Sequence, residues 1–345
     1  MTLTPLDLLL SQAPATRPIV ALSEGSDPRI IAGAQAARNA GIADVILVGD
    51  GESIRIELQN QGAQEGDGIT IHDPATSPLI EGFSDAYHDL RRHKGVDANA
   101  ARKAVQTPLV YAAMLVRMGH AAGTVGGAVA ATPDVVRAAL QVIGKAPDAA
   151  MVSSFFLMYP PENATGPARA MLYSDCGLVI DPSADDLVAI AHASAVSCRA
   201  LLQKEPKIAM LSFSTKGSAR HERVTKITDA AMKLQAQHPS LEVDGELQFD
   251  AAFLPSIGTS KAPGSEVAGQ ANVMIFPNLD AGNIAYKITQ RLGGYAAIGP
   301  ILQGLAKPAN DLSRGCSTED VTQMIAVTML QASKTQISQV VGKQP

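Results

Sequence analysis

The stretch IVALSEGSDPRIIAGAQAARNAGIADVILVGD, residues 19–50, decides the fold class of this chain. Two short apolar runs, residues 19–22 and 45–48, predict strands, and the segment between them predicts a helix. Asp27 is placed to cap that helix, and Pro28 takes its first position, where the missing N–H costs nothing. A strand, a helix and a second strand in this order are typical of a βαβ unit in a parallel sheet.

The same alternation of apolar strands and longer helices continues along the chain and predicts a doubly wound α/β protein. Further strands are expected at residues 69–72, 151–159, 171–174, 208–213, 241–247, 272–276 and 297–302, the last of them in a parallel sheet, and residues 122–130 are expected to form a Gly-rich strand and turn. A shift in composition near Pro147, reversed near Ala296, predicts two domains. The first comprises residues 1–147 plus 296–345, and the second is an inserted domain of residues 148–295. We expect the active site between them.

The composition of the 345 residues bounds the class of protein. Apolar residues make up 46% of the chain and aromatic residues 4%, so aliphatic cores of helices packed on sheets are expected. A formal net charge of −5 argues against nucleic acid as a partner. No apolar run approaches the roughly 18 residues of a membrane helix, and the N-terminus lacks a secretory signal pattern. We therefore expect no membrane partner.

Cysteine and histidine usage limits the cofactors. The three cysteines, Cys176, Cys198 and Cys316, are odd in number and widely spaced, which predicts reduced thiols in a cytoplasmic protein. The absence of G-x-G-x-x-G argues against a nicotinamide enzyme, and the seven histidines show no metal-binding spacing. We expect neither a metal nor a cofactor.

Two strand–helix loops carry polar groups suited to a site. The loop at residues 23–27 would face a cleft in a βαβ unit, although a capped turn explains Glu24 better. The turn STKGSARHE, residues 214–222, is basic and contains glycine, and such turns bind anions through backbone N–H groups. Without the G-x-x-x-x-G-K-[ST] spacing this second signal is weak.

The densest group of reactive side chains lies in GPILQGLAKPANDLSRGCSTED, residues 299–320. A strand is expected to end there in a Gly/Pro/Asn/Asp loop that leads into a helix. Ser313, Arg314 and Cys316 come just before that helix, and Asp320 lies in its first turn. Active sites of open α/β sheets lie where strands end in such loops, so we place the chemistry here.

Structural roles compete for these residues. Ser317 and Asp320 match the S-x-x-D/E pattern of a helix capping box. Asp311 is suited to cap a turn, and Arg314 to be a solvated surface arginine. The long, loosely structured approach to the helix favours function, because such loops are uncommon in compact domains without one.

Residues 211–220, 243–255 and 261–320 resemble the phosphate acetyltransferases of the phosphate acetyl/butyryltransferase family, and a looser match extends from about Pro18 to Ala332. The resemblance implies transfer of acetyl between acetyl phosphate and coenzyme A. It also implies two α/β/α domains in an arrangement like that of isocitrate and isopropylmalate dehydrogenases, and a homodimer. Coenzyme A, acetyl-CoA, acetyl phosphate and phosphate would be substrates, with no cofactor.

The resemblance also implies roles for particular residues. Ser313 and Arg314 would act at the acyl phosphate, and Asp320 would be the base for the coenzyme A thiol. A thiol with a pKa of roughly 8.5 needs such a base at neutral pH. Retention of all three residues argues against a non-catalytic sensing domain of the kind fused to malic enzymes. Phosphate butyryltransferase, the same reaction with a larger acyl pocket, stays open.

Further cationic residues are implied toward coenzyme A or phosphate. They are Arg91, whose register could instead select Arg92, and also Arg137 and Arg291. Arg91 and Arg291 have a structural alternative, because cations complement helix C-termini. Lys307 is close enough in sequence to the candidate loop to be a further anion contact.

Two departures from the family pattern stand in the strand at residues 122–130. Ala122 and Gly126 replace an aspartate and a serine that are usual in the family. Val135 and Ala138 likewise stand where threonine and proline are common. We expect these changes to remove hydroxyl groups from one wall of the site. A decarboxylating dicarboxylate dehydrogenase of similar architecture is disfavoured, since neither an aspartate cluster for a metal nor a nicotinamide site can be placed.

Overall fold

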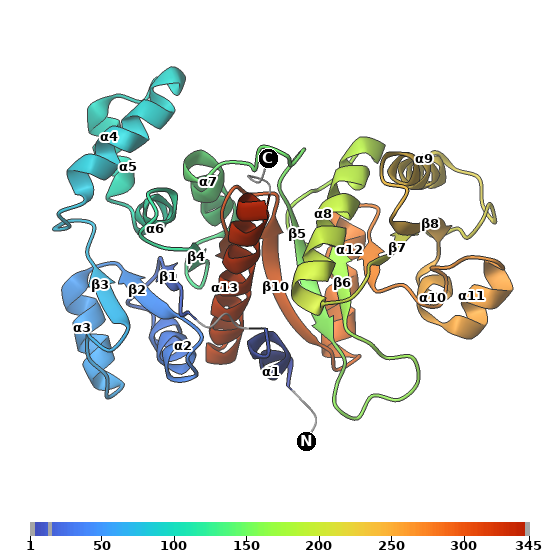
Figure 1. The fold of residues 1–345 in the computed structure, drawn as a ribbon, viewed down its shortest axis with the longest axis horizontal. Coiled ribbons are helices and arrows are strands. Elements are labelled where there is room, and N and C mark those ends of the chain that lie inside the picture. The colour runs from blue at the N-terminus through green and yellow to red at the C-terminus, as the bar shows by residue number, and fades with distance from the viewer. Residues whose placement is uncertain (1–3, 13–15, 342–345) are drawn as a thin grey trace. The chain divides into compact units, whose positions relative to one another are not determined.

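The computed structural model describes residues 4–12 and 16–341, with side chains described up to residue 333. The chain divides into two compact units (Figure 1). The split unit contains Leu6–Pro147 and the chain from Leu305 onward, and the inserted unit contains Asp148–Gly304. In this division the chain returns to the split unit at Leu305, later than the predicted residue 296, because the strand that begins at Ala296 pairs within the inserted unit.

The described part of the split unit forms a five-stranded sheet in the order β11-β4-β1-β2-β3, and every neighbouring pair is parallel. Its strands are β1 (Ile19–Leu22), β2 (Asp44–Val48), β3 (Ile69–His72), β4 (Gly123–Gly126) and β11 (Ala309–Asp311). The order reverses between β1 and β4, so the crevice at the carboxyl ends of these strands is a topological switch point. Strand β11 was not predicted, because its polar sequence Ala-Asn-Asp lies in what looked like a loop.

Helices cover the split-unit sheet. They are α2 (Pro28–Asn39), α3 (Gly51–Asn60), α4 (Ile80–Arg91), the 3-10 turn η1 (Arg92–Lys94), α5 (Ala98–Val105), α6 (Pro108–Arg117), α7 (Thr132–Val142) and α13 (Thr318–Val341), with α1 (Pro5–Leu10) at the start of the chain. Helix α2 begins as predicted, with Asp27 accepting the Arg29 N–H and Pro28 in the first turn. It packs closely on α13, since a Cβ at Gly33 would lie 2.5 Å from Val321 Cγ1.

The inserted unit contains a mixed sheet in the order β10-β5-β6-β9-β7-β8. Its strands are β5 (Ser153–Tyr159), β6 (Met171–Ser174), β7 (Lys207–Leu211), β8 (Glu242–Leu247), β9 (Val273–Ile275) and β10 (Ala296–Gln303). The pairs β10–β5 and β5–β6 are antiparallel and the others parallel. The α/β fold is confirmed, but the parallel pairing expected for residues 297–302 is wrong. A direct loop joins β5 to β6, and antiparallel strands need no crossover helix.

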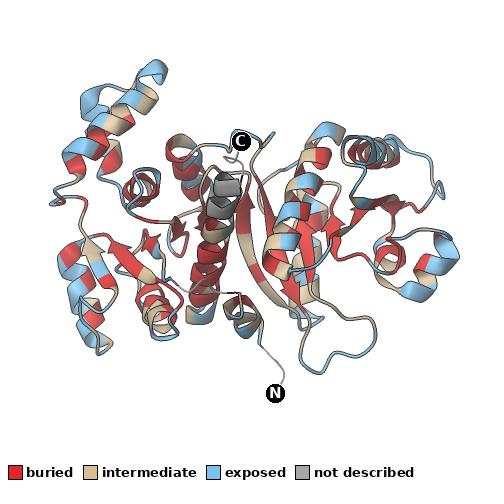
Figure 2. Cartoon of the chain, viewed as in Figure 1, coloured by how far each residue is buried: buried red, intermediate tan, exposed pale blue. Residues whose placement is uncertain are grey.

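The helices of the inserted unit are α8 (Ala184–Leu202), α9 (Glu222–Gln237), α10 (Phe249–Phe253), α11 (Pro255–Lys261) and α12 (Leu279–Arg291). Helix α8 starts with a capping box of Ser183 and Asp186. In Figure 2 the buried class follows the strands of each unit and the inner helix faces. The cores are mainly aliphatic, with Tyr111, Tyr173 and Phe155 as the largest fully buried side chains.

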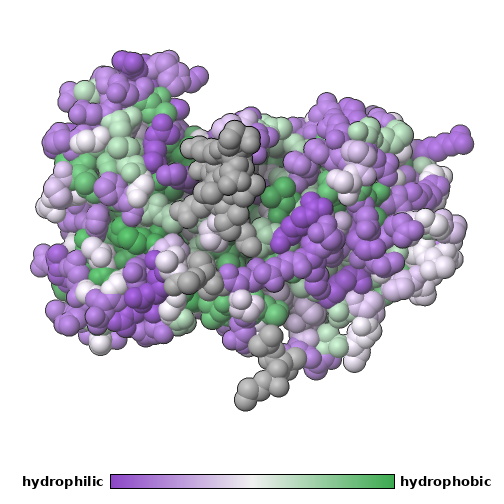
Figure 3. Space-filling model, viewed as in Figure 1, coloured by the Kyte–Doolittle hydropathy of each residue, from purple (hydrophilic) through white to green (hydrophobic). Residues whose placement is uncertain are grey.

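Hydrophilic residues predominate on the outer helices of both units in the face drawn in Figure 3. Among the helices within the described residues, none combines the length and the hydropathy that crossing a bilayer requires.

Candidate active site

The carboxyl ends of β1, β4 and β11 meet at the switch point of the split unit. Backbone hydrogen bonds join the loops that follow these strands, with Ser23 N–H donating to Val125 O at 3.1 Å and Leu312 N–H donating to Gly126 O at 2.7 Å. The loop with Ser313 and Arg314 therefore lies beside the turn that leads from β4 into α7.

Glu24, in the loop after β1, holds that turn. Its carboxylate accepts the backbone N–H groups of Ala128 at 2.7 Å, Val129 at 3.0 Å and Ala130 at 2.6 Å. Glu24 thus has a structural role as a cap, but the turn that it caps is that of residues 128–130 and not its own loop at residues 23–27. Because the chain's own carboxylate satisfies these N–H groups, they cannot serve as a backbone site for a bound phosphate without displacing Glu24.

Arg29, in the first turn of α2, clasps three loops together. Its guanidinium pairs with Asp27 through two hydrogen bonds of 3.0 and 2.8 Å. It also donates to Ala128 O at 2.8 Å, Arg314 O at 2.7 Å and Cys316 O at 3.3 Å. The hydrogen bond from Arg29 lowers the pKa of Asp27. Sequence reasoning missed this residue, because nothing in a single helix-start motif indicates contacts with residues 314–316.

These contacts of Arg29, called the clasp below, fix the backbone of residues 313–316. The two predicted reactive side chains of this segment do not take part in them. Ser313 and Arg314 are both exposed. Ser313 Oγ accepts the Gly315 N–H at 3.2 Å. Within the described part of the chain, no hydrogen bond or ion pair involves the Arg314 guanidinium. A cation presented on a rigid backbone in this way is suited to binding an anionic group.

Asp320 takes part in the capping box that begins α13. Its Oδ2 accepts Ser317 N–H at 2.8 Å and Ser317 Oγ–H at 2.9 Å, while Ser317 Oγ accepts Asp320 N–H at 3.2 Å. The structural interpretation of the S-x-x-D pattern is thus confirmed. No hydrogen bond to the second oxygen, Oδ1, is found among the described residues, so the cap occupies half of the carboxylate.

Asp311 is the buried carboxyl group of the site. It is 0% exposed at the end of β11, and its Oδ2 accepts the Thr132 hydroxyl at 2.6 Å. Thr132 is the first residue of α7, and its hydroxyl donates to Asp311 and does not cap the helix. Burial raises the pKa of Asp311 to about 7, Glu24 acts in the same direction, and the Thr132 hydrogen bond opposes both.

Cys316 is 6% exposed, next to the clasp. Burial raises the pKa of its thiol, an effect that Arg29 partly opposes. Since the thiolate is the nucleophile, a raised pKa makes Cys316 a poor candidate for an acyl-accepting group.

Two of the implied coenzyme A residues lie on helices of the split unit. Arg137 is exposed on α7 and pairs with Asp134 at 2.5 Å. Arg91 ends α4 half-buried, and its buried Nε has no hydrogen-bond partner within the described residues. Arg92 is exposed and lies 3.7 Å from Asp89. Of the two registers, Arg91 is the one with an unused, shielded donor.

Lys307 is not brought to the candidate loop, and Arg291 belongs to the other unit. Lys307 precedes β11, at the opposite end of the strand from Ser313, and its ammonium donates to Val116 O at 2.8 Å and Arg117 O at 3.4 Å. It therefore neutralises the carbonyl end of α6, a common place for a cation. Arg291 is the exposed last residue of α12, in the inserted unit.

The departures at Ala122 and Gly126 have different consequences. Ala122 precedes β4, where its N–H donates to Ile19 O at 2.8 Å, so it lies at the amino end of the strand, away from the site. Gly126 lies at the carboxyl end, and a Cβ there would be 2.3 Å from Ser23 Oγ. Position 126 therefore has no room for a larger side chain while Ser23 occupies the neighbouring space. We expected both replacements to change one wall of the site, and for Ala122 this expectation is wrong.

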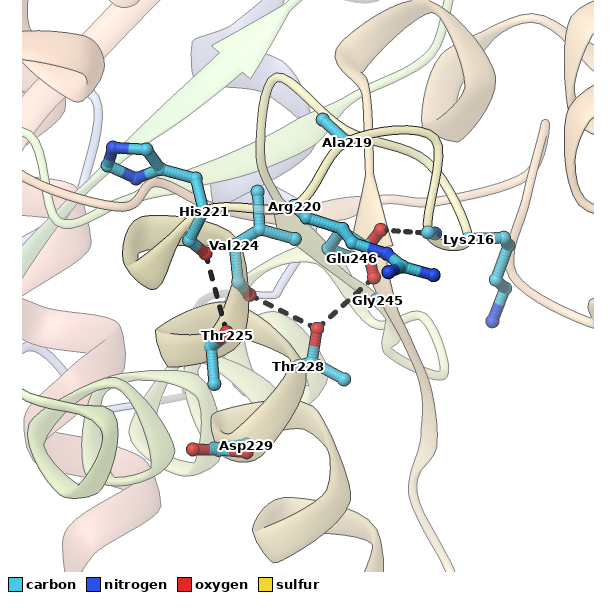
Figure 4. A pocket seen from close by; sticks show the side chains of 11 residues that line it. Lys216, Ala219, Arg220, His221, Val224, Thr225, Thr228, Asp229, Gly245 and Glu246 are labelled. Atoms are coloured by element: carbon cyan, nitrogen blue, oxygen red, sulfur yellow. Dashed lines mark hydrogen bonds between the residues drawn. The ribbon is translucent and has the colours of Figure 1, made fainter.

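The basic turn at residues 214–222 borders a cavity in the inserted unit (Figure 4). This open cavity of about 620 Å³ is lined by Lys216, Gly217, Ala219, Arg220, His221, Val224, Thr225, Thr228, Asp229, Gly245 and Glu246. The Glu246 carboxylate accepts Gly217 N–H at 2.7 Å, Ser214 Oγ–H at 2.9 Å and Thr228 Oγ1–H at 3.2 Å. Burial would raise the pKa of Glu246, but these hydrogen bonds outweigh it and the pKa is lowered. The turn thus binds an anion of the chain itself.

No group of three or more His, Cys, Asp or Glu side chains suited to a metal ion is present among the described residues.

The fold is that of a two-unit α/β protein, and proteins of low sequence identity share it. A 4-hydroxythreonine-4-phosphate dehydrogenase from Klebsiella pneumoniae matches it with a TM-score of 0.53 at 13% identity, covering 93% of this chain and 99% of that one. At that identity the likeness shows the fold alone.

Sequence comparison defines the family. Residues 6–329 match the model of the family described as Phosphate acetyl/butaryl transferase. The phosphate acetyltransferase of Paracoccus denitrificans is 48% identical over 327 residues, which cover 95% of this chain and 99% of the relative. A crystal structure of a phosphotransacetylase from Streptococcus pyogenes matches with a TM-score of 0.90 at 40% identity, covering 97% of this chain and all of that one. The chain therefore belongs to the phosphate acetyl/butyryltransferase family, as the sequence resemblance indicated.

Proposed function

We propose that the chain is a phosphate acetyltransferase that works by direct attack of the coenzyme A thiol on bound acetyl phosphate. The reaction, acetyl-CoA + phosphate ⇌ acetyl phosphate + CoA, is supported by family membership and by relatives of that name matched over nearly their full length. One observation carries the mechanism: Ser313 and Arg314 extend outward from a backbone that Arg29 fixes at the switch point.

Side chains, and not backbone N–H groups, bind the phosphate. In both strand–helix turns suited to an anion, a carboxylate of the chain is already bound: Glu24 takes three backbone N–H groups of one turn, and Glu246 takes the Gly217 N–H of the other. An exposed arginine fork can instead bind two phosphate oxygens at once. Arg314 is placed for this role, and the Ser313 hydroxyl is placed to donate to a neighbouring oxygen.

The chemistry needs charge stabilisation at the acetyl phosphate. The coenzyme A sulfur forms a bond to the carbonyl carbon, and the carbonyl oxygen gains negative charge. When the intermediate collapses, the bond from carbon to the phosphate oxygen breaks and phosphate leaves with the electron pair. Arg314 and Ser313 stabilise the oxygens on which the charge develops, the contribution that is usually the largest in acyl transfer.

Asp320 accepts the thiol proton. Its Oδ2 is held by Ser317, which fixes the direction of the carboxylate, and its Oδ1 is the oxygen that takes the proton. The capping box and the base are therefore two functions of one side chain. A positioned general base of this kind contributes on the order of 10²–10⁴ in rate.

Arginines bind the phosphates of coenzyme A. In the split unit, Arg91 and Arg137 serve this role, supported by the shielded Nε of Arg91 and the exposure of Arg137. Arg291 contributes from the inserted unit. We withdraw Lys307 from the set, because its ammonium serves the carbonyl groups at the end of α6.

We propose a homodimer that uses α12 as part of its interface. Gly282 is the buried residue of this helix, while Ile284, Ile288 and Leu292 follow at a spacing of four and are 57%, 52% and 85% exposed. Such a stripe on one helix face is typical of a surface that another chain covers. Light scattering should give twice the chain mass, and Ile288→Glu should shift it toward the monomer. A monomeric wild type at micromolar concentration would refute the assembly.

We propose a cytoplasmic location. Cys176, Cys198 and Cys316 are buried as free thiols, the state expected in a reducing compartment. Cell fractionation should recover the activity in the cytosolic fraction, and activity confined to a secreted fraction would contradict this.

The reaction is tested by coenzyme A acylation from acetyl, propionyl and butyryl phosphate. We expect the highest kcat/KM with acetyl phosphate, measured as thioester absorbance without nicotinamide. A preference for butyryl phosphate would transfer the chain to the butyryl branch of the family. No turnover with any of the three would leave only a binding role.

A further inference from the structure

Asp311 has a place in the fold that the reaction described above does not use. It is fully buried where β11 ends, one residue before Leu312 and two before Ser313. Its Oδ2 is bonded to Thr132, the first residue of α7, the helix that carries Arg137. The carboxyl group thus links the loop at the acyl phosphate to the helix assigned to coenzyme A.

The other oxygen of Asp311 has a different environment. Within the described residues, Oδ1 is buried and lacks a hydrogen-bond partner. It lies against Gly127, where an added Cβ would be 2.1 Å away. A buried carboxylate with an unsatisfied oxygen is costly, whereas a neutral carboxyl group in the same place costs much less.

The surrounding charges favour the same neutral form. From the end of β1, Glu24 contributes a negative charge, and the groups packed closest from β4, α7 and the following loop, Gly127, Thr132 and Leu312, are uncharged. The guanidinium of Arg29 is engaged with Asp27 and loop carbonyls. Burial and Glu24 accordingly raise the pKa of Asp311 to about 7.

We propose that Asp311 is a positioning residue that acts in its protonated form, holding the loop of Ser313 and Arg314 in register with α7 through the Thr132 hydroxyl. Ionisation strengthens the Thr132 hydrogen bond, but it places a second negative charge beside Glu24 and charges the buried Oδ1, which lacks a hydrogen-bond partner within the described residues. The resulting repulsion strains the link between loop and helix. The inference rests on the proposed function for its link to catalysis, but the titration of Asp311 is a property of the fold.

The test is the dependence of kcat on pH from 5.5 to 9 for the wild type and Asp311→Asn, with acetyl phosphate and coenzyme A saturating. Asparagine imitates the neutral acid. Wild-type kcat should therefore fall about fivefold from a lower-pH plateau to a higher-pH plateau, with a midpoint near pH 7. Asp311→Asn should keep kcat within about threefold at pH 6 and lack the fall. Asp50→Asn is the matched control at the end of β2 and should retain the wild-type profile.

Two results would overturn the proposal. One is a loss of more than about a hundredfold in Asp311→Asn at every pH with an unchanged melting temperature, which would mean that the charge is required. The other is a pH profile identical to that of the wild type. If Asp311→Asn does not fold, substitutions of Thr132 test the same hydrogen bond. Thr132→Ser should keep kcat, and Thr132→Val should lose about tenfold in kcat. Equal kcat values for the two variants would refute the link between Thr132 and Asp311.

The melting temperature separates this inference from the proposed function. Between pH 5 and 8 the wild type should lose stability relative to Asp311→Asn, whether or not the chain turns over acetyl phosphate. An inactive wild type that shows this difference would refute the function and leave the titration of Asp311 standing. Parallel melting curves would refute the protonated form itself.

Discussion

Replacing Asp320 with asparagine separates the two functions assigned to this side chain. Asparagine is nearly isosteric, and its amide oxygen can still accept the Ser317 N–H and hydroxyl that the structure places 2.8 and 2.9 Å from Oδ2. What it loses is the ability to take a proton at Oδ1. The capping box should survive Asp320→Asn, whereas the base should not.

The expected magnitudes differ enough to decide between the two. Loss of a helix cap costs about 0.5–2 kcal/mol of stability. Loss of a general base costs on the order of 10²–10⁴ in rate, or about 3–5 kcal/mol in activation free energy. Asp320→Asn should therefore lower kcat at least about a hundredfold while the melting temperature barely moves. Ser317→Ala removes the cap and keeps the carboxylate, so it should lose about 0.5–2 kcal/mol of stability and keep most of kcat.

The assay is steady-state coenzyme A acetylation at pH 7 and pH 8, with thermal unfolding of the same preparations. Because the thiol has a pKa of about 8.5, its thiolate fraction rises from roughly 3% to roughly 24% over that interval. The ratio of the Asp320→Asn rate to the wild-type rate should consequently increase from pH 7 to pH 8. If Asp320→Asn turns over normally at pH 7, or if the two variants lose rate and stability alike, Asp320 is a helix cap alone and the base lies elsewhere.

Three further substitutions test the neighbouring contacts. Arg29→Lys cannot reproduce the contacts to Ala128 O, Arg314 O and Cys316 O, so unfolding should be easier by about 1–3 kcal/mol and kcat should fall at least about tenfold; normal kinetics would refute the clasp. Arg314→Lys keeps the charge but loses the two-pronged guanidinium geometry, so kcat/KM for acetyl phosphate should drop about a hundredfold at an unchanged melting temperature. A near-normal value would mean that Arg314 does not bind the acyl phosphate. The pKa of Asp311 lies at about 7 in the folded chain against an ordinary 3.8, so its protonation stabilises the fold below pH 4, and up to about 4 kcal/mol is lost as pH rises to 7. Denaturant titrations of wild type and Asp311→Asn should differ accordingly, and equal slopes against pH would refute this.

The sequence predicted most elements because local signals and tertiary structure agree in them. The first βαβ unit, β3 and the capping box at Ser317 follow from apolar runs and capping residues. Strand β11 could not be predicted, because three residues reading Ala-Asn-Asp become a strand only when β4 offers them a parallel edge. The orientation of β10 was missed for a similar reason, since a buried apolar run does not state the direction of its neighbour.

The site residues likewise differ in whether a local sequence pattern could identify them. Ser313, Arg314 and Asp320 are close in sequence, so one motif identifies them together. The clasp of Arg29 spans 285 residues to Arg314 O, and no local pattern carries that contact. Lys307 shows the opposite case, because it is near the loop in sequence while the length of β11 separates it from Ser313.

Direct transfer between the two substrates is the central claim, and isotope exchange without coenzyme A tests it most directly. Acetyl phosphate and [³²P]phosphate are incubated with the enzyme, and label in acetyl phosphate is measured. A covalent acyl-enzyme, for example on Cys316, would release phosphate and recapture it, so it would catalyse the exchange in the absence of the thiol. The account predicts no exchange above background until coenzyme A is added. Exchange at a rate comparable to kcat without coenzyme A would contradict direct attack by the thiol.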